Sequence, residues 1–176
     1  MNKEILNQIA TKMVSGSKGI LAMDESHGTC EKRFDALKIT VNEENRRSYR
    51  DMLVSAGSLS KSISGAILFD ETIRQKTNDG STFPEFLNNI GIMPGIKVDT
   101  GAKDFSCHAN EKITEGLDNL SQRIEEYKSI GAKFAKWRAV ITIGEKIPSL
   151  ACMVSVSYTH LPSPRDATLC RMPSSA

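Results

Sequence analysis

The first 150 residues alternate between apolar runs and stretches with helical periodicity. Ile5, Ile9 and Met13 recur every four residues, which predicts a short amphipathic helix that ends near Gly16. Four apolar runs have the length of buried strands. They cover residues 19–24, 63–69, 95–99 and 132–141.

Helical segments are predicted between these runs. Thr40 and Glu43 have the spacing of a capping box and begin a charged helix over 40–56. The segment FPEFLNNIG predicts a short helix that stops at Gly91. A longer helix is expected over 111–130, because apolar residues recur there at intervals of three and four. This stripe consists of Ile113, Leu117, Leu120, Ile124, Tyr127 and Ile130.

Four apolar strands separated by helical connections are typical of parallel βα units, whose sheet is covered on both faces. No Walker loop and no GxGxxG follows the first run, which argues against a nucleotide-binding doubly wound sheet. A closed eight-stranded βα barrel needs about 250 residues. The 176 residues therefore predict an α/β fold that comprises the first four βα units of a partial (β/α)8 TIM barrel.

The character of the sequence changes after about residue 150. Residues 154–176 contain three prolines and scattered serines, without a sustained period of either kind. We expect residues 1–153 to form the barrel part and 154–176 to be an unstructured tail. The tail is interpreted as foreign to the fold, for example a frameshift or a fusion scar, with a flexible natural tail as the alternative.

Composition excludes several classes of protein. With 23 basic and 21 acidic residues the net charge is +2, too balanced for a nucleic-acid-binding surface. No window approaches 18 apolar residues, and the charged N-terminus lacks the apolar core of a signal peptide. The four cysteines form no CxxC pair, and the adjacent Cys107 and His108 have no second cluster at ligand spacing. We expect a cytoplasmic protein with reduced thiols, no membrane or nucleic-acid partner, and no metal site.

Charges occur where the strands are expected to end. Asp24 ends the first run, Lys97 and Asp99 are two apart in the third, and so are Lys136 and Arg138 in the fourth. Because unpaired buried charges are costly, these residues predict a polar pocket at the barrel mouth that accepts an anionic substrate. Salt bridges at the barrel end are the alternative. The loop after the first strand adds hydroxyls and cations suited to phosphate. They are Ser26, Thr29, Lys32 and Arg33.

The segments GILAMDESHGT, EENRRSYR, GAILFDETIRQK, GIKVD, EGLDNLSQRIEEYK and AKFAKWR together resemble class I fructose-bisphosphate aldolase. They follow one another in family order over about residues 3–150. The resemblance implies a (β/α)8 barrel, commonly a homotetramer. It implies reversible cleavage of fructose 1,6-bisphosphate to dihydroxyacetone phosphate and glyceraldehyde 3-phosphate in glycolysis and gluconeogenesis. The reaction would proceed through a lysine Schiff base, with no metal and no cofactor.

The resemblance also implies roles for individual residues. Asp24 matches the catalytic aspartate of the first strand, and Lys136 matches the catalytic lysine of the fourth. The positions matched to substrate binding are Ser26, Thr29, Arg33, Arg46, Lys97 and Arg138. His27 and Thr29 are substitutions within the family's loop.

The family's acid/base glutamates belong to its fifth strand, and its imine-forming lysine belongs to its sixth. We therefore expect the 176-residue chain to be inactive by itself. The alternatives are a non-catalytic barrel fragment that acts only by association, and another phosphosugar lyase or isomerase on the same fold.

Overall fold

The computed structural model describes residues 3–160 of the chain. The chain divides into two compact units, a sheet unit (Met1–Lys97 with Ser121–Lys136) and a hairpin unit (Val98–Leu120 with Trp137–Ala176). This division differs from the expected boundary at residue 153. In the hairpin unit, the segment after the third strand of the sheet packs with the C-terminal helix rather than continuing the barrel pattern.

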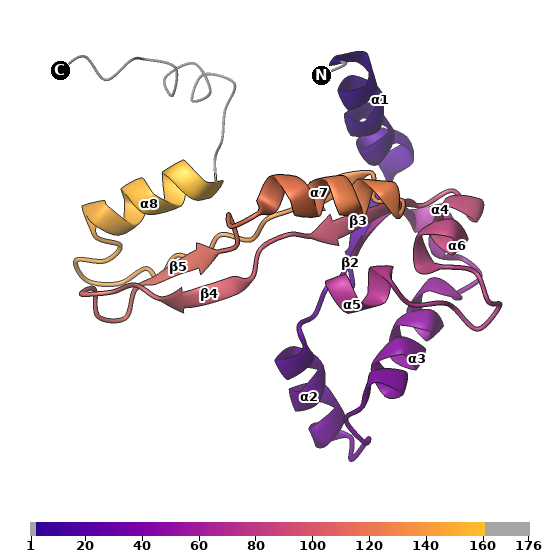
Figure 1. The fold of residues 1–176 in the computed structure, drawn as a ribbon, viewed down its shortest axis with the longest axis horizontal. Coiled ribbons are helices and arrows are strands. Elements are labelled where there is room, and N and C mark those ends of the chain that lie inside the picture. Colours follow the sequence, from indigo (N-terminus) through magenta and orange to yellow (C-terminus); the bar gives the residue numbers. More distant parts are fainter. Residues whose placement is uncertain (1–2, 161–176) are drawn as a thin grey trace. The chain divides into compact units, whose positions relative to one another are not determined.

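The sheet unit is built on four parallel strands in the order β1-β2-β3-β6, of which the central β2 and β3 are labelled in Figure 1. They are β1 (Gly19–Ala22), β2 (Ile63–Leu68), β3 (Met93–Lys97) and β6 (Phe134–Lys136). Helical segments connect these strands, as parallel pairing requires. This confirms the predicted α/β class with about four βα units.

The core of the sheet unit lies along the two central strands. Ala66, Leu68 and Ile96 are almost fully buried. The ring of Phe134 lies over β3, and a Cβ added at Gly95 would be 2.3 Å from that ring. β1 is the exception, because among the described residues it pairs with β2 alone, and Ile20 remains 43% exposed. The expectation that the whole first run is buried is therefore wrong, while Met23, directly after it, is fully buried.

The helices predicted from the sequence occur in the sheet unit with shifted ends. They are α1 (Lys3–Val14, continued by the 3-10 turn Ser15–Ser17), α3 (Glu43–Val54), α6 (Phe83–Asn89) and most of α7 (Leu120–Ser129). Three further helices were not predicted, namely α2 (His27–Ala36), α4 (Leu59–Ser62) and α5 (Asp70–Ile73). The cap of α3 is Asn42, whose side chain accepts from the Asn45 N–H at 2.7 Å, and not the predicted Thr40. The capping box occurs instead at Thr82 and Glu85, where α6 begins.

The hairpin unit contains β4 (Gly101–Asp104) paired antiparallel with β5 (Lys112–Glu115). The predicted helix over 111–130 is wrong in its first part, because this stretch forms β5 and α7 begins only at Leu120. Gly116 separates the two with a φ of +128°, and an added Cβ there would be 2.9 Å from the backbone nitrogen of Thr100. The spacing of Ile113 and Leu117 matched a helix, but the ladder with β4 takes up the backbone groups of β5 instead.

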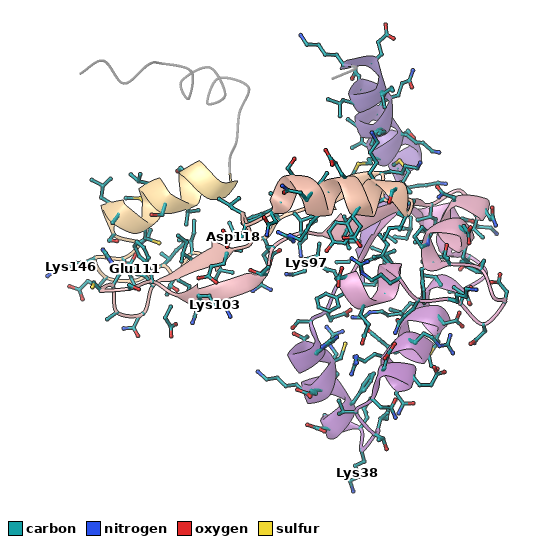
Figure 2. The ribbon with its side chains drawn as sticks, viewed as in Figure 1. Lys38, Lys97, Lys103, Glu111, Asp118 and Lys146 are labelled. Atoms are coloured by element: carbon teal, nitrogen blue, oxygen red, sulfur yellow. The ribbon has the colours of Figure 1, made fainter. Side chains whose placement is uncertain are left out.

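Helix α8 (Leu150–His160) completes the hairpin unit. The carboxylate of Glu111, labelled in Figure 2, accepts from the Ser149 N–H at 2.8 Å, and Ser149 Oγ accepts from the Cys152 N–H at 3.1 Å. The second bond satisfies one of the N–H groups in the first turn of α8. We expected no regular structure from residue 154 onward. This prediction is wrong for residues 154–160, which belong to α8, and residues 161–176 lie outside the described residues. No helix among the described residues has the length and apolar character needed to cross a membrane.

Candidate functional site

The side chains of Asp24 and Lys136 meet in the sheet unit. β1 ends at Ala22, and the Met23 N–H still donates to the Ile67 carbonyl at 3.1 Å, so Asp24 stands directly beyond the pairing with β2. Lys136 is the last residue of β6. Its Nζ donates to Asp24 Oδ2 at 2.5 Å, and the two side chains are 27% and 9% exposed. Two groups separated by 112 residues of chain therefore form one partly buried ion pair.

This contact shows that the sheet is curved. β1 and β6 occupy its opposite edges, with β2 and β3 between them. In a flat sheet the outer strands would be about 14 Å apart, three spacings of about 4.8 Å, and their side chains would stand perpendicular to it. A contact of 2.5 Å requires both strand ends to turn toward a common axis. That curvature is the one expected of part of a barrel.

Lys97 brings a second cation to the same end of the sheet. Lys97, labelled in Figure 2, is the last residue of β3, and its direct register partner is Lys136. Register partners in adjacent parallel strands point to the same face. Two ammonium groups and one carboxylate therefore gather at the carboxyl ends of β1, β3 and β6. Such a set can bind an anionic oxygen, while the Asp24 carboxylate can accept a hydrogen bond from a hydroxyl.

The loop after β1 carries hydroxyl groups at the start of α2. Ser26 precedes α2, and its Oγ lies 3.2 Å from Thr29 Oγ1. Arg33, one turn further along α2, pairs with Glu25 and donates to Tyr49 Oη at 3.1 Å. The Arg33 side chain is 52% exposed. The hydroxyls of Ser26 and Thr29 are thus exposed, whereas the Arg33 guanidinium already pairs with the Glu25 carboxylate.

Arg46 is held inside the sheet unit by Glu71 of α5. Its Nε and Nη2 donate to the two Glu71 oxygens at 2.8 and 2.6 Å, a bidentate pair between side chains that are 12% and 15% exposed. The hydrogen bonds from Arg46 lower the pKa of Glu71 against the opposing effect of burial. A substrate anion at Arg46 would have to compete with this carboxylate.

Arg138 and Asp99 lie in the hairpin unit, beyond the strands in which they were expected. β3 ends at Lys97 and β6 at Lys136, so the period-two argument that gave each pair a common face does not apply. Asp99 is 7% exposed, and its carboxylate accepts from the backbone N–H groups of Gly101 and Arg138, both at 3.2 Å. Asp99 therefore organises backbone in this unit.

Sequence reasoning missed the buried Arg50 and its half-buried partner Glu71. Arg50 is fully buried, although it occurs in the highly charged segment EENRRSYR. Its position four residues after Arg46 places both on one face of α3, and this spacing was the available signal. Nothing in the local sequence indicated that this face would be covered by α5.

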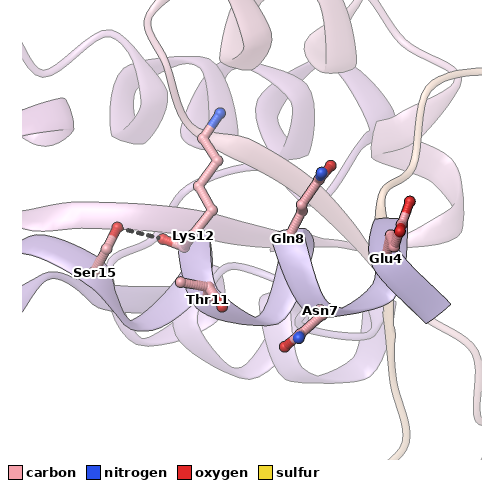
Figure 3. A pocket seen from close by; sticks show the side chains of 6 residues that line it. All are labelled: Glu4, Asn7, Gln8, Thr11, Lys12 and Ser15. Atoms are coloured by element: carbon pink, nitrogen blue, oxygen red, sulfur yellow. Dashed lines mark hydrogen bonds between the residues drawn. The ribbon is translucent and has the colours of Figure 1, made fainter.

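A separate pocket lies along α1, and neither Asp24 nor Lys136 lines it. It is lined by Glu4, Asn7, Gln8, Thr11, Lys12 and Ser15 (Figure 3). Ser15 Oγ donates to the Lys12 carbonyl at 3.0 Å within it. No residue of α1 is buried, so this is an exposed polar hollow. Within residues 3–160, no group of three or more His, Cys, Asp or Glu side chains is placed to hold a metal ion.

Comparison with known proteins gives a consistent result. Residues 5–172 match the family model "Fructose-bisphosphate aldolase class-I". A probable fructose-bisphosphate aldolase class 1 from Xanthomonas axonopodis pv. citri is 53% identical over 171 residues, which are 97% of this chain and 50% of that protein. The fructose-bisphosphate aldolase of Plasmodium falciparum (isolate K1 / Thailand) is 51% identical over 140 residues, 80% of this chain and 39% of that protein.

A solved structure is similar in fold. It is the fructose-bisphosphate aldolase from Plasmodium falciparum in complex with TRAP and a small-molecule inhibitor. It aligns with a TM-score of 0.83 and 44% identity, covering 90% of this chain and 47% of that one. The chain thus spans about half the length of the curated relatives it matches.

Proposed function

Because the chain belongs to the class I fructose-bisphosphate aldolase family, we propose that it supplies Asp24 and Lys136 to an aldolase active site. The reaction is the reversible cleavage of fructose 1,6-bisphosphate to dihydroxyacetone phosphate and glyceraldehyde 3-phosphate, in cytoplasmic glycolysis and gluconeogenesis. The observation that carries the proposal is the 2.5 Å contact between Lys136 Nζ and Asp24 Oδ2. It joins the two positions that the family resemblance independently matches to catalysis.

Each member of this pair has a distinct task. The Lys136 ammonium donates hydrogen bonds to a substrate oxygen on which negative charge develops, and thereby stabilises the transition state. The Asp24 carboxylate accepts from a substrate hydroxyl and holds the lysine toward the reacting carbon. Lys97, the register partner of Lys136, adds positive charge that attracts the phosphorylated substrate.

The loop groups after β1 suit the polar end of a sugar phosphate. Ser26 and Thr29 hydroxyls, 3.2 Å apart, donate to hydroxyl or phosphate oxygens, and Arg33 adds a cation one turn away. We assign Arg46 a weaker part in binding, since Glu71 already accepts from the Nε and Nη2 edge of its guanidinium.

The covalent step depends on groups that the resemblance assigns to later strands. The family's imine-forming lysine belongs to the sixth strand and its acid/base glutamates to the fifth, whereas the described residues of this chain hold four parallel strands. We therefore propose that the 176 residues alone do not turn over fructose 1,6-bisphosphate. Lys136 is engaged with Asp24 and is not the nucleophile.

Borohydride trapping tests this division of labour. The 176-residue chain, and a hybrid in which the C-terminal half of the Xanthomonas relative follows residue 153, are each mixed with dihydroxyacetone phosphate and borohydride, then mapped by mass spectrometry. We expect a stoichiometric adduct only in the hybrid, on a lysine of the added half. An adduct on Lys136 together with measurable cleavage by the 176-residue chain would overturn the proposal.

Kinetics of the hybrid then test the assigned residues. Lys136→Met should lower kcat by about 100-fold or more, the usual cost of losing one transition-state donor. Lys133→Met is the matched control, because Lys133 lies three residues earlier, is exposed, and uses its backbone N–H on the Pro94 carbonyl. Equal activity of the two variants would contradict the role of Lys136.

A second candidate function is association without catalysis. In the described part of the chain, β1 and β6 each pair with one neighbour only, so each leaves one strand edge open. Open edges of this kind favour pairing with another chain. Sedimentation of the 176-residue chain with a full-length relative distinguishes the two: a mixed complex with no sugar binding favours association, whereas sugar binding by a monomer favours the aldolase role.

A further inference from the structure

Arg50 is an unusual residue because its whole side chain is buried. It lies in the second half of α3 and is 0% exposed, the largest of the fully buried side chains. Burying a guanidinium costs several kcal/mol unless hydrogen bonds and a counter-charge replace its hydration. Its contacts therefore indicate what it does in the fold.

Two of these contacts flank Asp24. Arg50 Nε donates to the Met23 carbonyl at 3.3 Å, and Nη2 donates to the Glu25 carbonyl at 2.6 Å. The last sheet-type bond of this segment is the one from the Met23 N–H to Ile67. Beyond that point the β-ladder is replaced by Arg50, which fixes the backbone on both sides of Asp24.

Arg50 is itself held in place by Glu71 of α5 and by Phe69, the residue directly before α5. Its guanidinium carbon lies 5.6 Å from the centre of the Phe69 ring, and Nη1 faces Glu71 Oε2 at 3.6 Å. Glu71 is oriented in turn by the bidentate bonds from Arg46. The guanidinium of Arg50 is thus held in one orientation by the Phe69 ring and the Glu71 carboxylate, and Arg46 on the same helix face orients Glu71.

We propose that Arg50 is a positioning residue that holds the Asp24 carboxylate against Lys136. It touches no reacting group and acts through the two carbonyls on either side of Asp24. The planar guanidinium reaches the two carbonyls from two separate nitrogens, whereas the donors of a lysine all lie on one nitrogen. This inference rests on the proposed function for its catalytic meaning, but the geometry can be tested without any sugar.

The test measures the acetylation rate of Lys136 in the 176-residue chain. Acetic anhydride at fixed pH and mass spectrometry give the rate relative to Lys61 and Lys128, which are exposed lysines of the same unit. Asp24→Asn should raise the relative rate at Lys136 by about threefold or more, since the amine loses its ionic partner. Arg50→Lys should raise it by a similar factor. Arg47→Lys is the matched control, because Arg47 lies on the same helix and bonds Glu44 and the Lys76 carbonyl instead.

A double variant separates positioning from general loosening. If Arg50 acts through Asp24, then Arg50→Lys in the Asp24→Asn background should add no further labelling at Lys136. An additional increase in that background, or an unchanged rate in Arg50→Lys alone, overturns the proposal. In either case the borohydride trap reports separately on the aldolase role.

Glu71→Gln keeps the test decisive if Arg50→Lys unfolds, which would show as loss of the native circular dichroism spectrum. Glu71→Gln leaves Arg50 in place but removes the negative charge 3.6 Å from its Nη1. We expect a smaller rise in Lys136 labelling that disappears in the Asp24→Asn background. A folded Glu71→Gln variant with wild-type labelling at Lys136 would overturn the proposal.

Discussion

The sheet unit contains a buried ion pair, whereas an ion pair of the hairpin unit is exposed. In the sheet unit, Arg50 faces Glu71 at 3.6 Å with its side chain fully buried. In the hairpin unit, Lys112 contacts Asp104 at 2.6 Å, but these side chains are 45% and 92% exposed. Loss of one partner should cost more in the buried pair, because the remaining charge is left without water, whereas water screens exposed charges. Burial, and not distance alone, therefore decides what the removal of one partner costs.

The difference also bears on function. In the sheet unit the buried Arg50 bonds the backbone on both sides of Asp24, and the carboxylate of Asp24 meets Lys136. The buried carboxylates of the hairpin unit, Asp99 and Glu111, accept from backbone N–H groups. We propose that the buried arginine of the sheet unit orients a pair with a catalytic role, whereas the buried carboxylates of the hairpin unit shape its backbone.

The largest expected effect comes from Arg50→Met. This change keeps the bulk of the side chain but removes the cation, so Glu71 and the carbonyls of Met23 and Glu25 lose a buried partner. Breaking one side of a buried pair costs about 3–5 kcal/mol of unfolding free energy. Urea unfolding measures it, with Lys112→Met in the hairpin unit as the matched control. Equal losses in both variants would contradict the comparison between the units.

Gly95→Ala should have the next largest effect. The added Cβ would be 2.3 Å from the Phe134 ring, so the ring or β3 must move. Overpacking of this kind costs about 1–3 kcal/mol. Phe134→Leu removes the ring, and the double variant should recover part of the loss in thermal melts. If Phe134→Leu does not relieve Gly95→Ala, the close packing of β3 against β6 is not the cause.

Protonation of Glu71 should lower the free energy of unfolding at acidic pH. Its pKa is lowered in the folded protein, mainly by the hydrogen bonds from Arg46, from an ordinary value of 4.5. The unfolded chain therefore binds more protons as the pH falls through this region. The stabilisation is complete above pH 4.5 and is lost as the pH drops through the folded pKa.

Urea unfolding between pH 6 and pH 3 checks this, with Glu71→Gln as the comparison. The wild type should lose more stability than Glu71→Gln over this range, because the variant has no carboxyl group to protonate. Parallel pH curves for the two proteins would contradict it.

The sequence predicted the sheet better than it predicted the site. Four apolar runs are a strong local signal, and they form the four parallel strands. The helix expected over 111–130 was wrong at its start, because Ile113 and Leu117 fit helical spacing while a ladder with β4 decided the outcome. The hydrophobic periodicity of a segment carries no information about the strand with which that segment will pair.

For the candidate site, the sequence identified charges at strand ends but not their partners. Asp24, Lys97 and Lys136 were recognisable because charged residues are unexpected in apolar runs, and the structure brings them to one end of the sheet. Arg50 and Glu71 were missed since both occur in charged segments that have the composition of a surface. Only the packing of α3 against α5 shows that they are enclosed.

The smallest effect is expected for Asp104→Asn in the hairpin unit. The carboxylate is 92% exposed, and its pKa is lowered by the hydrogen bond and the charge of Lys112. Removing the charge should leave the urea midpoint unchanged at physiological salt, because salt screens a pair of exposed side chains. Measurements at low and high salt check this, and any small loss at low salt should vanish at high salt. A salt-independent loss would mean that exposed and buried pairs contribute alike, so the contrast between the two units would have to rest on something other than burial.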